Sequence, residues 1–189
     1  MPLLIPSFTL KKLISIVQAG GVIAYPTEGV FGLGCDFLNA DAVHRILAIK
    51  KRDVAKGLIL VAHHIDSLLP YLAELTPHQR ALLDESWPGP ITWVIPHNGT
   101  LPDWITGGRP TVAVRVSDHP IVKHLCLTLD QPLVSTSANH SGKVALTSRT
   151  QVSVCLGKDI DAIVTGRVQS IGKASTIRDL KTGLTLRAS

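Results

Sequence analysis

Two short groups of polar residues in this sequence could bind a polyphosphate. Lys50 and Arg52 stand one residue apart at the end of a predicted helix, and the run Ser135-Thr136-Ser137-Ala138-Asn139 follows the apolar residues 132–134. A guanidinium can hold two phosphate oxygens at once, and an ammonium supplies a compact positive charge. Small hydroxyl and amide side chains can approach phosphate or ribose closely. The two groups together predict a nucleotide site.

A third polar segment, Tyr25-Pro26-Thr27-Glu28, also follows an apolar strand. Ligands of α/β proteins usually bind at such strand ends. Glu28 is a candidate carboxylate, although the sequence pairs no second carboxylate with it. Each of the three segments has a plainer interpretation as a solvated helix end, a turn or a cap. We favour ligand binding because each segment adjoins an apolar strand, although neither a P-loop nor a dinucleotide fingerprint is present.

The composition predicts one globular domain over residues 1–189, with 45% hydrophobic residues and a mean hydropathy of +0.26. A net charge of +5 makes polyanions plausible partners without choosing among them. Cys35, Cys126 and Cys155 have no metal-ligand spacing, and we expect no protein-bound structural metal. Aromatic residues make up 4% of the chain, too few for the base-stacking surfaces of single-strand RNA binders.

The sequence predicts a cytoplasmic protein that does not enter a membrane. No segment approaches the roughly 20 apolar residues that a membrane-spanning helix needs. The apolar start from Met1 to Pro6 is followed, rather than preceded, by Lys11 and Lys12, an order that is wrong for a secretory signal.

Hydrophobic periodicity predicts helices and strands in alternation. Helices are expected after Thr9, from Asn39 or Asp41 to the basic pair, from Thr76 to the residue before Trp87, and from Ser117 to Leu129. Strands are expected at 22–25, 57–61, 91–95, 111–116, 132–134, 161–165, 175–179 and 184–187, and a glycine-rich loop at 31–35. Because loops alone join several strands, we predict an α/β fold: a single-domain twisted mixed β-sheet flanked by helices.

Five motifs, in this order, resemble those of the YrdC family. They are Ala24-Tyr25-Pro26-Thr27-Glu28, Lys50-x-Arg52 with Lys56-Gly57-Leu58, Trp87-Pro88-Gly89-Pro90-Ile91-Thr92, Val112-Ala113-Val114-Arg115-Val116 with Asp118-His119-Pro120, and Ser135-Thr136-Ser137-Ala138-Asn139-x-Ser141-Gly142. The resemblance runs from about 22 to 187, and the short chain is similar to the single-domain threonylcarbamoyl-AMP synthases of that family. It implies a nucleotidyltransferase that makes L-threonylcarbamoyladenylate from L-threonine, bicarbonate or CO2, and ATP. The product serves the threonylcarbamoyl modification of adenosine 37 in tRNA.

The resemblance also implies roles for individual residues. ATP contacts fall on Lys50, Arg52, Thr111, Ser137, Asn139 and Arg187; threonine contacts fall on Thr27, Arg115, Ser135 and Ser175; and Lys50, Arg52, Ser137 and Asn139 are the expected catalytic residues. Mg²⁺ is expected with ATP, and partner proteins of tRNA modification are expected to accept the adenylate. Lys173 and Ala174 stand where relatives often have a glycine-proline turn, which makes Ser175 and Arg187 the least supported of these assignments.

The alternative class is a non-catalytic protein that binds tRNA or double-stranded RNA through its basic surface. Such a protein would show steep salt dependence and no threonine requirement. Even for an enzyme, we expect weak RNA binding by Arg45, Lys51 and Lys56, which surround the basic pair. The chemistry itself requires no covalent nucleophile, because fixed cations stabilise the carbamate and the leaving pyrophosphate.

Overall fold

The computed structural model describes residues 5–170 and 172–188 of the chain. Most of the apolar start, Met1 to Leu4, lies outside these residues, as does Ile171. Within the described ranges, no helix is both long enough and apolar enough to cross a membrane.

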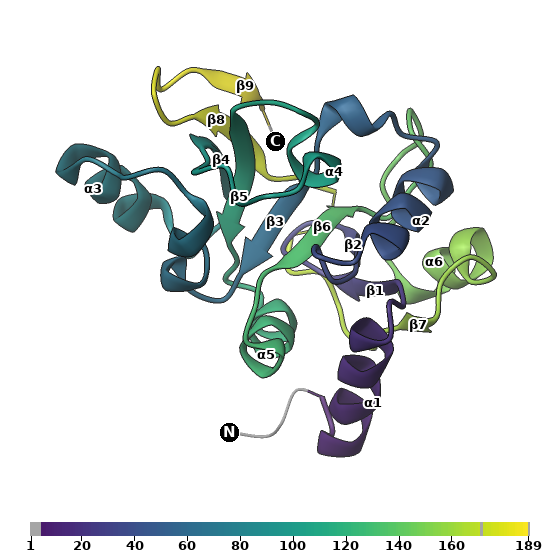
Figure 1. Ribbon diagram of the computed structural model, residues 1–189. Coiled ribbons are helices and arrows are strands. Elements are labelled where there is room, and N and C mark those ends of the chain that lie inside the picture. Colours follow the sequence, from purple (N-terminus) through teal and green to yellow (C-terminus); the bar gives the residue numbers. More distant parts are fainter. Residues whose placement is uncertain (1–4, 171, 189) are drawn as a thin grey trace.

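A sheet of nine strands runs through the part of the chain that the structure describes (Figure 1). Its strands are β1 (Ile23–Pro26), β2 (Phe31–Gly34), β3 (Ile59–Ala62), β4 (Ile91–Pro96), β5 (Thr111–Val116), β6 (Leu133–Ser137), β7 (Ala162–Ile163), β8 (Thr176–Asp179) and β9 (Thr185–Arg187). Their spatial order is β7-β1-β2-β6-β3-β5-β4-β8-β9. The pairs β1–β7, β3–β5 and β4–β8 are parallel, and the other neighbours are antiparallel. The predicted mixed sheet is confirmed.

Helices cover both faces of this sheet. They are α1 (Ser7–Gln18), α2 (Ala40–Lys50), α3 (Pro77–Ser86), α4 (Asp103–Thr106), α5 (Pro120–Leu129) and α6 (Arg149–Leu156), with short 3-10 turns at Val54–Lys56, Ile65–Ser67 and Leu69–Tyr71. In β1, Ile23 and Tyr25 pack with α1 and α5, whereas Ala24 belongs to the core that contains α2 and α4. This division follows from the alternation of side chains along a strand. The sheet therefore separates two cores.

Two helix starts agree with the sequence and two do not. Asn39 caps α2 by accepting from the amide of Ala42 at 3.0 Å, and Thr76 forms the predicted capping box with Gln79. The first helix begins at Ser7 rather than after Thr9.

The helix predicted to start at Ser117 begins three residues later, at Pro120, with His119 as its cap. The Ser117 hydroxyl and the Asp118 amide instead donate to Glu28, at 2.7 and 3.0 Å. A long-range carboxylate therefore binds the residues that come immediately before the first turn of α5.

The glycine-rich stretch 31–35 was expected to be a loop, but Phe31–Gly34 forms the buried strand β2. Its glycines serve close packing rather than a turn. A Cβ at Gly34 would stand 2.7 Å from the ring of Tyr25 and 2.5 Å from the carbonyl oxygen of Val134. The strand can lie between β1 and β6 because these positions have no side chain.

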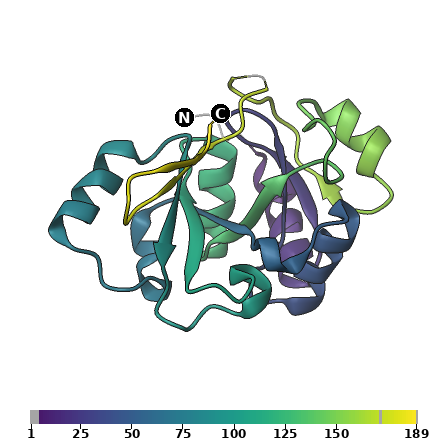
Figure 2. The same cartoon turned by 90° about the horizontal axis from the view of Figure 1, so that it is seen from above.

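A segment between β7 and β8 crosses the end of β1, and we call residues 166–170 and 172–175 the crossing segment. The carbonyl oxygen of Glu28 accepts from the amides of Gln169 and Ser170, at 2.9 and 2.6 Å, and that of Gly29 accepts from Gly172 at 2.9 Å. Figure 2 shows this part of the chain leading from β7 to the β8–β9 hairpin. A Cβ on Gly29 would collide with the carbonyl oxygen of Lys173, so the backbones touch here.

Candidate active site

A cavity of about 340 Å³ opens over the central strands. Ser135 of β6, Ile59 of β3 and Ala113 of β5 stand opposite one another in the strand register, and all three line the cavity. Gly32 of β2 lines it as well. Small side chains at several of these positions leave room for a ligand on the sheet. The cavity is thus built by long-range strand pairing.

Positive side chains gather along this cavity. Arg52, Lys56, Arg109 and Arg187 all line it. Burial lowers the pKa of Arg52 below its ordinary value, and the charges of Arg187 and Arg109 lower it further. The pKa of Arg187 is lowered by burial and by Arg115. Because guanidinium groups stay charged at neutral pH, this group of cations favours an anionic ligand.

Arg52 also has an unused donor. Its Nη2 donates to the carbonyl oxygen of Gly57 at 2.9 Å, which fixes the side chain. Its Nε is buried and has no hydrogen-bond partner among the described residues. A buried donor without a partner is costly, and a bound anion in the adjoining cavity would supply the missing acceptor.

Lys50 lies beneath the hydroxyl-rich run rather than in the cavity. Its Nζ donates to the carbonyl oxygens of Ser137 and Asn139 and to Oδ1 of Asn139, the latter two at 3.0 and 2.9 Å. The Ser137 hydroxyl donates to the same Oδ1 at 2.7 Å. Burial lowers the pKa of Lys50 to about 8, and Arg52 contributes to the lowering. Lys50 therefore holds the end of β6 in place from below.

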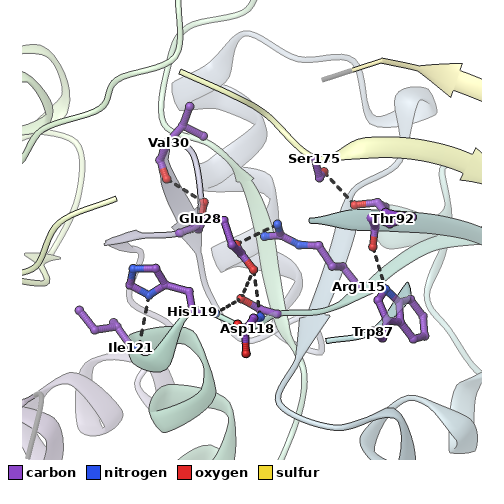
Figure 3. Close-up of polar contacts among 12 residues, drawn as sticks. Glu28, Val30, Trp87, Thr92, Arg115, Asp118, His119, Ile121 and Ser175 are labelled. Carbon is purple, nitrogen blue, oxygen red and sulfur yellow. Dashed lines mark hydrogen bonds and ion pairs between the residues drawn. The ribbon is translucent and has the colours of Figure 1, made fainter. Parts of the chain in front are cut away.

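A buried ion pair forms another side of the cavity. Nη1 of Arg115 donates to Oε2 of Glu28 at 3.0 Å (Figure 3). The Nε of Arg115 is buried and, like that of Arg52, has no hydrogen-bond partner in the described parts of the chain. Thr27, next to Glu28, donates from its hydroxyl to the carbonyl oxygen of Val30 at 2.8 Å. This side of the cavity combines a guanidinium with short polar groups.

Ser175 joins the cavity through the crossing segment. Its hydroxyl lies 2.8 Å from the Thr92 hydroxyl on β4, as Figure 3 shows. Nη2 of Arg187 donates to the Ser175 carbonyl oxygen at 2.8 Å. Two residues that are well separated in the sequence from the rest of the site are thereby fixed beside it.

The structure gathers most of the residues that the sequence singled out. Those that line the cavity are Thr27, Arg52, Thr111, Arg115, Ser135, Ser137, Ser175 and Arg187. Lys50 and Asn139 instead lie behind it, bonded to each other. Sequence reasoning missed Arg109, although the glycines at 107 and 108, both with positive φ, indicate a tight turn before it.

The expected RNA-binding trio is divided in the structure. Arg45 pairs with Asp161 at 2.6 Å and also donates to the carbonyl oxygen of Asp159, so it joins α2 to the start of β7. Lys56 lines the cavity. Tertiary contacts therefore give Arg45 and Lys56 different surroundings, and RNA binding by the three residues stays a prediction.

The cavity offers little to a resident metal ion. Among its described lining residues, Glu28 is the one carboxylate, and it already accepts from Arg115, Ser117 and Asp118. No group of three or more His, Cys, Asp or Glu side chains placed to hold a metal occurs within the described residues.

The fold and the cavity define a class: small mixed α/β proteins with a cation-lined cavity over the centre of a sheet. The family model Sua5/YciO/YrdC, described as "Telomere recombination", matches residues 15–189. The chain belongs to this family, and the resemblance seen in the five motifs is confirmed.

Bacterial relatives match the chain over nearly its whole length. The threonylcarbamoyl-AMP synthase of Stutzerimonas stutzeri is 46% identical over 97% of this chain and 99% of its own. The enzyme of the same name from Pseudomonas aeruginosa is 48% identical over 97% of this chain and 99% of its own. That from Vibrio cholerae is 48% identical over 94% of this chain and 96% of its own.

Two solved structures have the same fold. Sua5 of P. abyssi in complex with L-threonine is 34% identical, with a TM-score of 0.89 over 96% of this chain and 53% of that one. E. coli YciO is 25% identical, with a TM-score of 0.83 over 95% of this chain and 88% of that one.

Proposed function

We propose that this protein synthesises L-threonylcarbamoyladenylate from L-threonine, bicarbonate or CO2, and ATP, and releases pyrophosphate. One observation carries the proposal: a single cavity combines the Arg115–Glu28 side with the cations Arg52, Arg109 and Arg187. The first suits the carboxylate of an amino acid, and the second suits a triphosphate. The names of the bacterial relatives and the threonine complex of Sua5 support the same assignment.

The reaction begins with the amine of threonine. In its neutral form it attacks CO2, a C–N bond forms, and the departing proton leaves a carbamate anion. A cavity rich in guanidinium groups disfavours a further cation, so it lowers the pKa of the bound amine. Glu28 accepts three hydrogen bonds through its carboxylate, and we therefore assign it no role as the base.

In the second step, a carbamate oxygen attacks the α-phosphorus of ATP. An O–P bond forms, the bond to the β-phosphate bridging oxygen breaks, and pyrophosphate leaves with the electron pair. On this proposal, Arg52, Arg109 and Arg187, which line the cavity, stabilise the charge that moves onto the pyrophosphate. We assign the phosphate contacts to these residues and to Thr111 and Ser137, with Lys50 and Asn139 supporting them from behind.

On this proposal, Mg²⁺ enters with ATP as part of the substrate. The adenylate then passes to partner proteins that transfer the threonylcarbamoyl group to adenosine 37 of tRNA. A non-catalytic RNA-binding role is less favoured, since Lys56 and four arginines line a cavity.

Pyrophosphate release tests the proposal directly. We expect release to need ATP, L-threonine and bicarbonate together, and to fall to background when any one is omitted. Threonine-independent release at the same rate would indicate a plain ATPase instead. Detection of an adenylate by mass spectrometry, with carbon from labelled bicarbonate, would identify the product.

A further inference from the structure

The Glu28 carboxylate lies beside the proposed threonine site and accepts three hydrogen bonds. Both of its oxygens are used: Oε2 accepts from Arg115 at 3.0 Å, and Oε1 accepts from the Ser117 hydroxyl at 2.7 Å and the Asp118 amide at 3.0 Å. Its residue is 8% exposed, and that of Arg115 is 6% exposed. Figure 3 shows the carboxylate lying between Arg115 and the Asp118 turn. The pair is therefore held rigidly away from solvent.

This arrangement leaves one edge of the Arg115 guanidinium for a ligand. Glu28 engages Nη1, while the buried Nε has no hydrogen-bond partner among the residues described. A planar guanidinium has fixed donor directions, so holding Nη1 also sets the direction of Nε. A ligand carboxylate in the cavity would meet a donor that is already aimed.

Glu28 also organises the opposite side of the site through its backbone. Its carbonyl oxygen accepts from the amides of Gln169 and Ser170 in the crossing segment. The same segment carries Ser175, whose hydroxyl contacts Thr92. One residue thus connects β5, which carries Arg115, to the segment that delivers Ser175.

We propose that Glu28 is a positioning residue for threonine: its carboxylate orients Arg115 toward the amino-acid carboxylate without touching the substrate. The inference rests on the proposed function, because it assigns the Arg115 side of the cavity to threonine. It predicts that loss of the Glu28 charge weakens threonine binding selectively. ATP binding, which involves other residues of the cavity, is retained.

Glu28→Gln is the sharpest variant because every partner of this carboxylate is a donor in the structure. A carboxylate offers acceptors at both oxygens, whereas a glutamine amide turns one end into a donor. That end must face Arg115 or the Asp118 turn and break the contact there. We expect the dissociation constant for threonine to rise about tenfold or more, the size associated with a hydrogen bond to a charged group. The constant for ATP should stay within about twofold of wild type.

Titration calorimetry with threonine and ATP, each alone, measures both constants without turnover. Asp161→Asn is the matched control, since it removes the exposed Arg45–Asp161 ion pair, which lies at the opposite end of β1 from Glu28, and should change neither constant. If Glu28→Gln weakened the binding of threonine and of ATP equally, Glu28 would have a general structural role and the proposal would be overturned. Unchanged or tighter threonine binding would overturn it as well.

Two further variants keep the test decisive. If Glu28→Gln does not fold, Ser117→Ala removes one hydrogen bond to the carboxylate and keeps the ion pair. Threonine affinity should then fall about fivefold. An unchanged threonine affinity in Ser117→Ala would overturn the proposal. In an Arg115→Gln background, Glu28→Gln should add less than about twofold, because its effect passes through Arg115.

The outcomes also separate this inference from the synthase proposal. If Glu28→Gln weakens threonine binding selectively but the wild-type protein releases no pyrophosphate, the result would count against the synthase proposal alone. Pyrophosphate release of the expected kind, with an unaffected Glu28→Gln variant, would count against the positioning role alone. A wild-type chain with no affinity for threonine would overturn both.

Discussion

At the scale of single residues, two neighbouring cations have different surroundings. Arg52 lines the cavity, and its buried Nε has no hydrogen-bond partner within residues 5–170 and 172–188. Lys50 is 3% exposed and donates to backbone and amide oxygens behind the cavity. The motif Lys50-x-Arg52 therefore combines a residue that lines the cavity with one that makes internal hydrogen bonds. Between them, Lys51 ends α2 in the left-handed conformation, and packing gives the two flanking side chains different surroundings.

Substitution of either cation by alanine should reduce turnover strongly. Arg52→Ala removes a donor aimed at the phosphates, and Lys50→Ala releases the loop that carries Ser137 and Asn139. The loss of one well-placed electrostatic donor costs about 10²–10³ in rate. Steady-state pyrophosphate release, with circular dichroism to check folding, measures the effect.

Lys51→Ala provides the comparison within the same motif. Lys51 is exposed and takes the left-handed conformation that ends α2. Its removal should leave the rate within about twofold. Near-wild-type activity in a folded Arg52→Ala protein would mean that Arg52 does not contact the phosphates.

At the scale of elements, the start of α5 shows how the site and a helix share the same residues. His119 is buried and caps α5: Nδ1 accepts from the Ile121 amide at 3.3 Å, and Nε2 lies 3.0 Å from the carbonyl oxygen of Arg167. This pattern requires the neutral imidazole, with its proton on Nε2. Burial lowers the pKa of His119, and the nearby charges of Glu28, Arg115 and Asp118 modify the shift.

Acid should therefore weaken the fold through His119. Since its folded pKa lies below the unfolded value, the unfolded chain binds the proton more readily, and stability is complete above about pH 6.5. As the pH falls from there through the folded pKa, protonation of His119 removes the cap. The free energy of unfolding then falls by on the order of 1 kcal/mol. Urea unfolding at pH 7.5 and 5.5 measures the loss.

His119→Asn separates this effect from the other histidines. Asparagine is a good helix cap and does not titrate, so the variant should lose less stability than wild type between the two pH values. Equal losses in both proteins would show that His119 contributes nothing to the acid sensitivity.

At the scale of the whole molecule, a chain of net charge +5 gathers a group of its basic residues at the cavity. Arg52, Lys56, Arg109, Arg115 and Arg187 line it, while Arg45 is neutralised by Asp161. Much of the cationic surface that could attract RNA is thus also the surface that we assign to ATP.

RNA binding, where it occurs, should be weak and should compete with ATP. Each phosphate contact adds about 0.7–0.9 to the magnitude of the log–log salt slope, and the few cations available predict a shallow dependence. Fluorescence anisotropy of a labelled RNA duplex, titrated with and without saturating ATP, tests this. RNA binding that ATP does not affect would place the RNA surface elsewhere on the molecule.

The sequence by itself determined the class of fold and, with the family resemblance, a set of site residues most of which line the cavity. Local patterns suffice for this: apolar strands end in short polar segments, and caps such as Asn39 and Thr76 act on their own helices. The motifs and their order also indicated the family to which the chain belongs. Arg52, Arg115 and Ser137 are accordingly site residues that the sequence predicts.

The tertiary structure alone decided how these residues work together. That 31–34 is a strand depends on Gly34 fitting between Tyr25 and β6, and that α5 begins at Pro120 depends on Glu28 taking the donors of Ser117 and Asp118. These partners are far apart in the sequence, and no local periodicity records them. Long-range contacts likewise placed Lys50 behind the cavity and Arg109 within it, because side-chain direction follows from packing rather than from spacing along the chain.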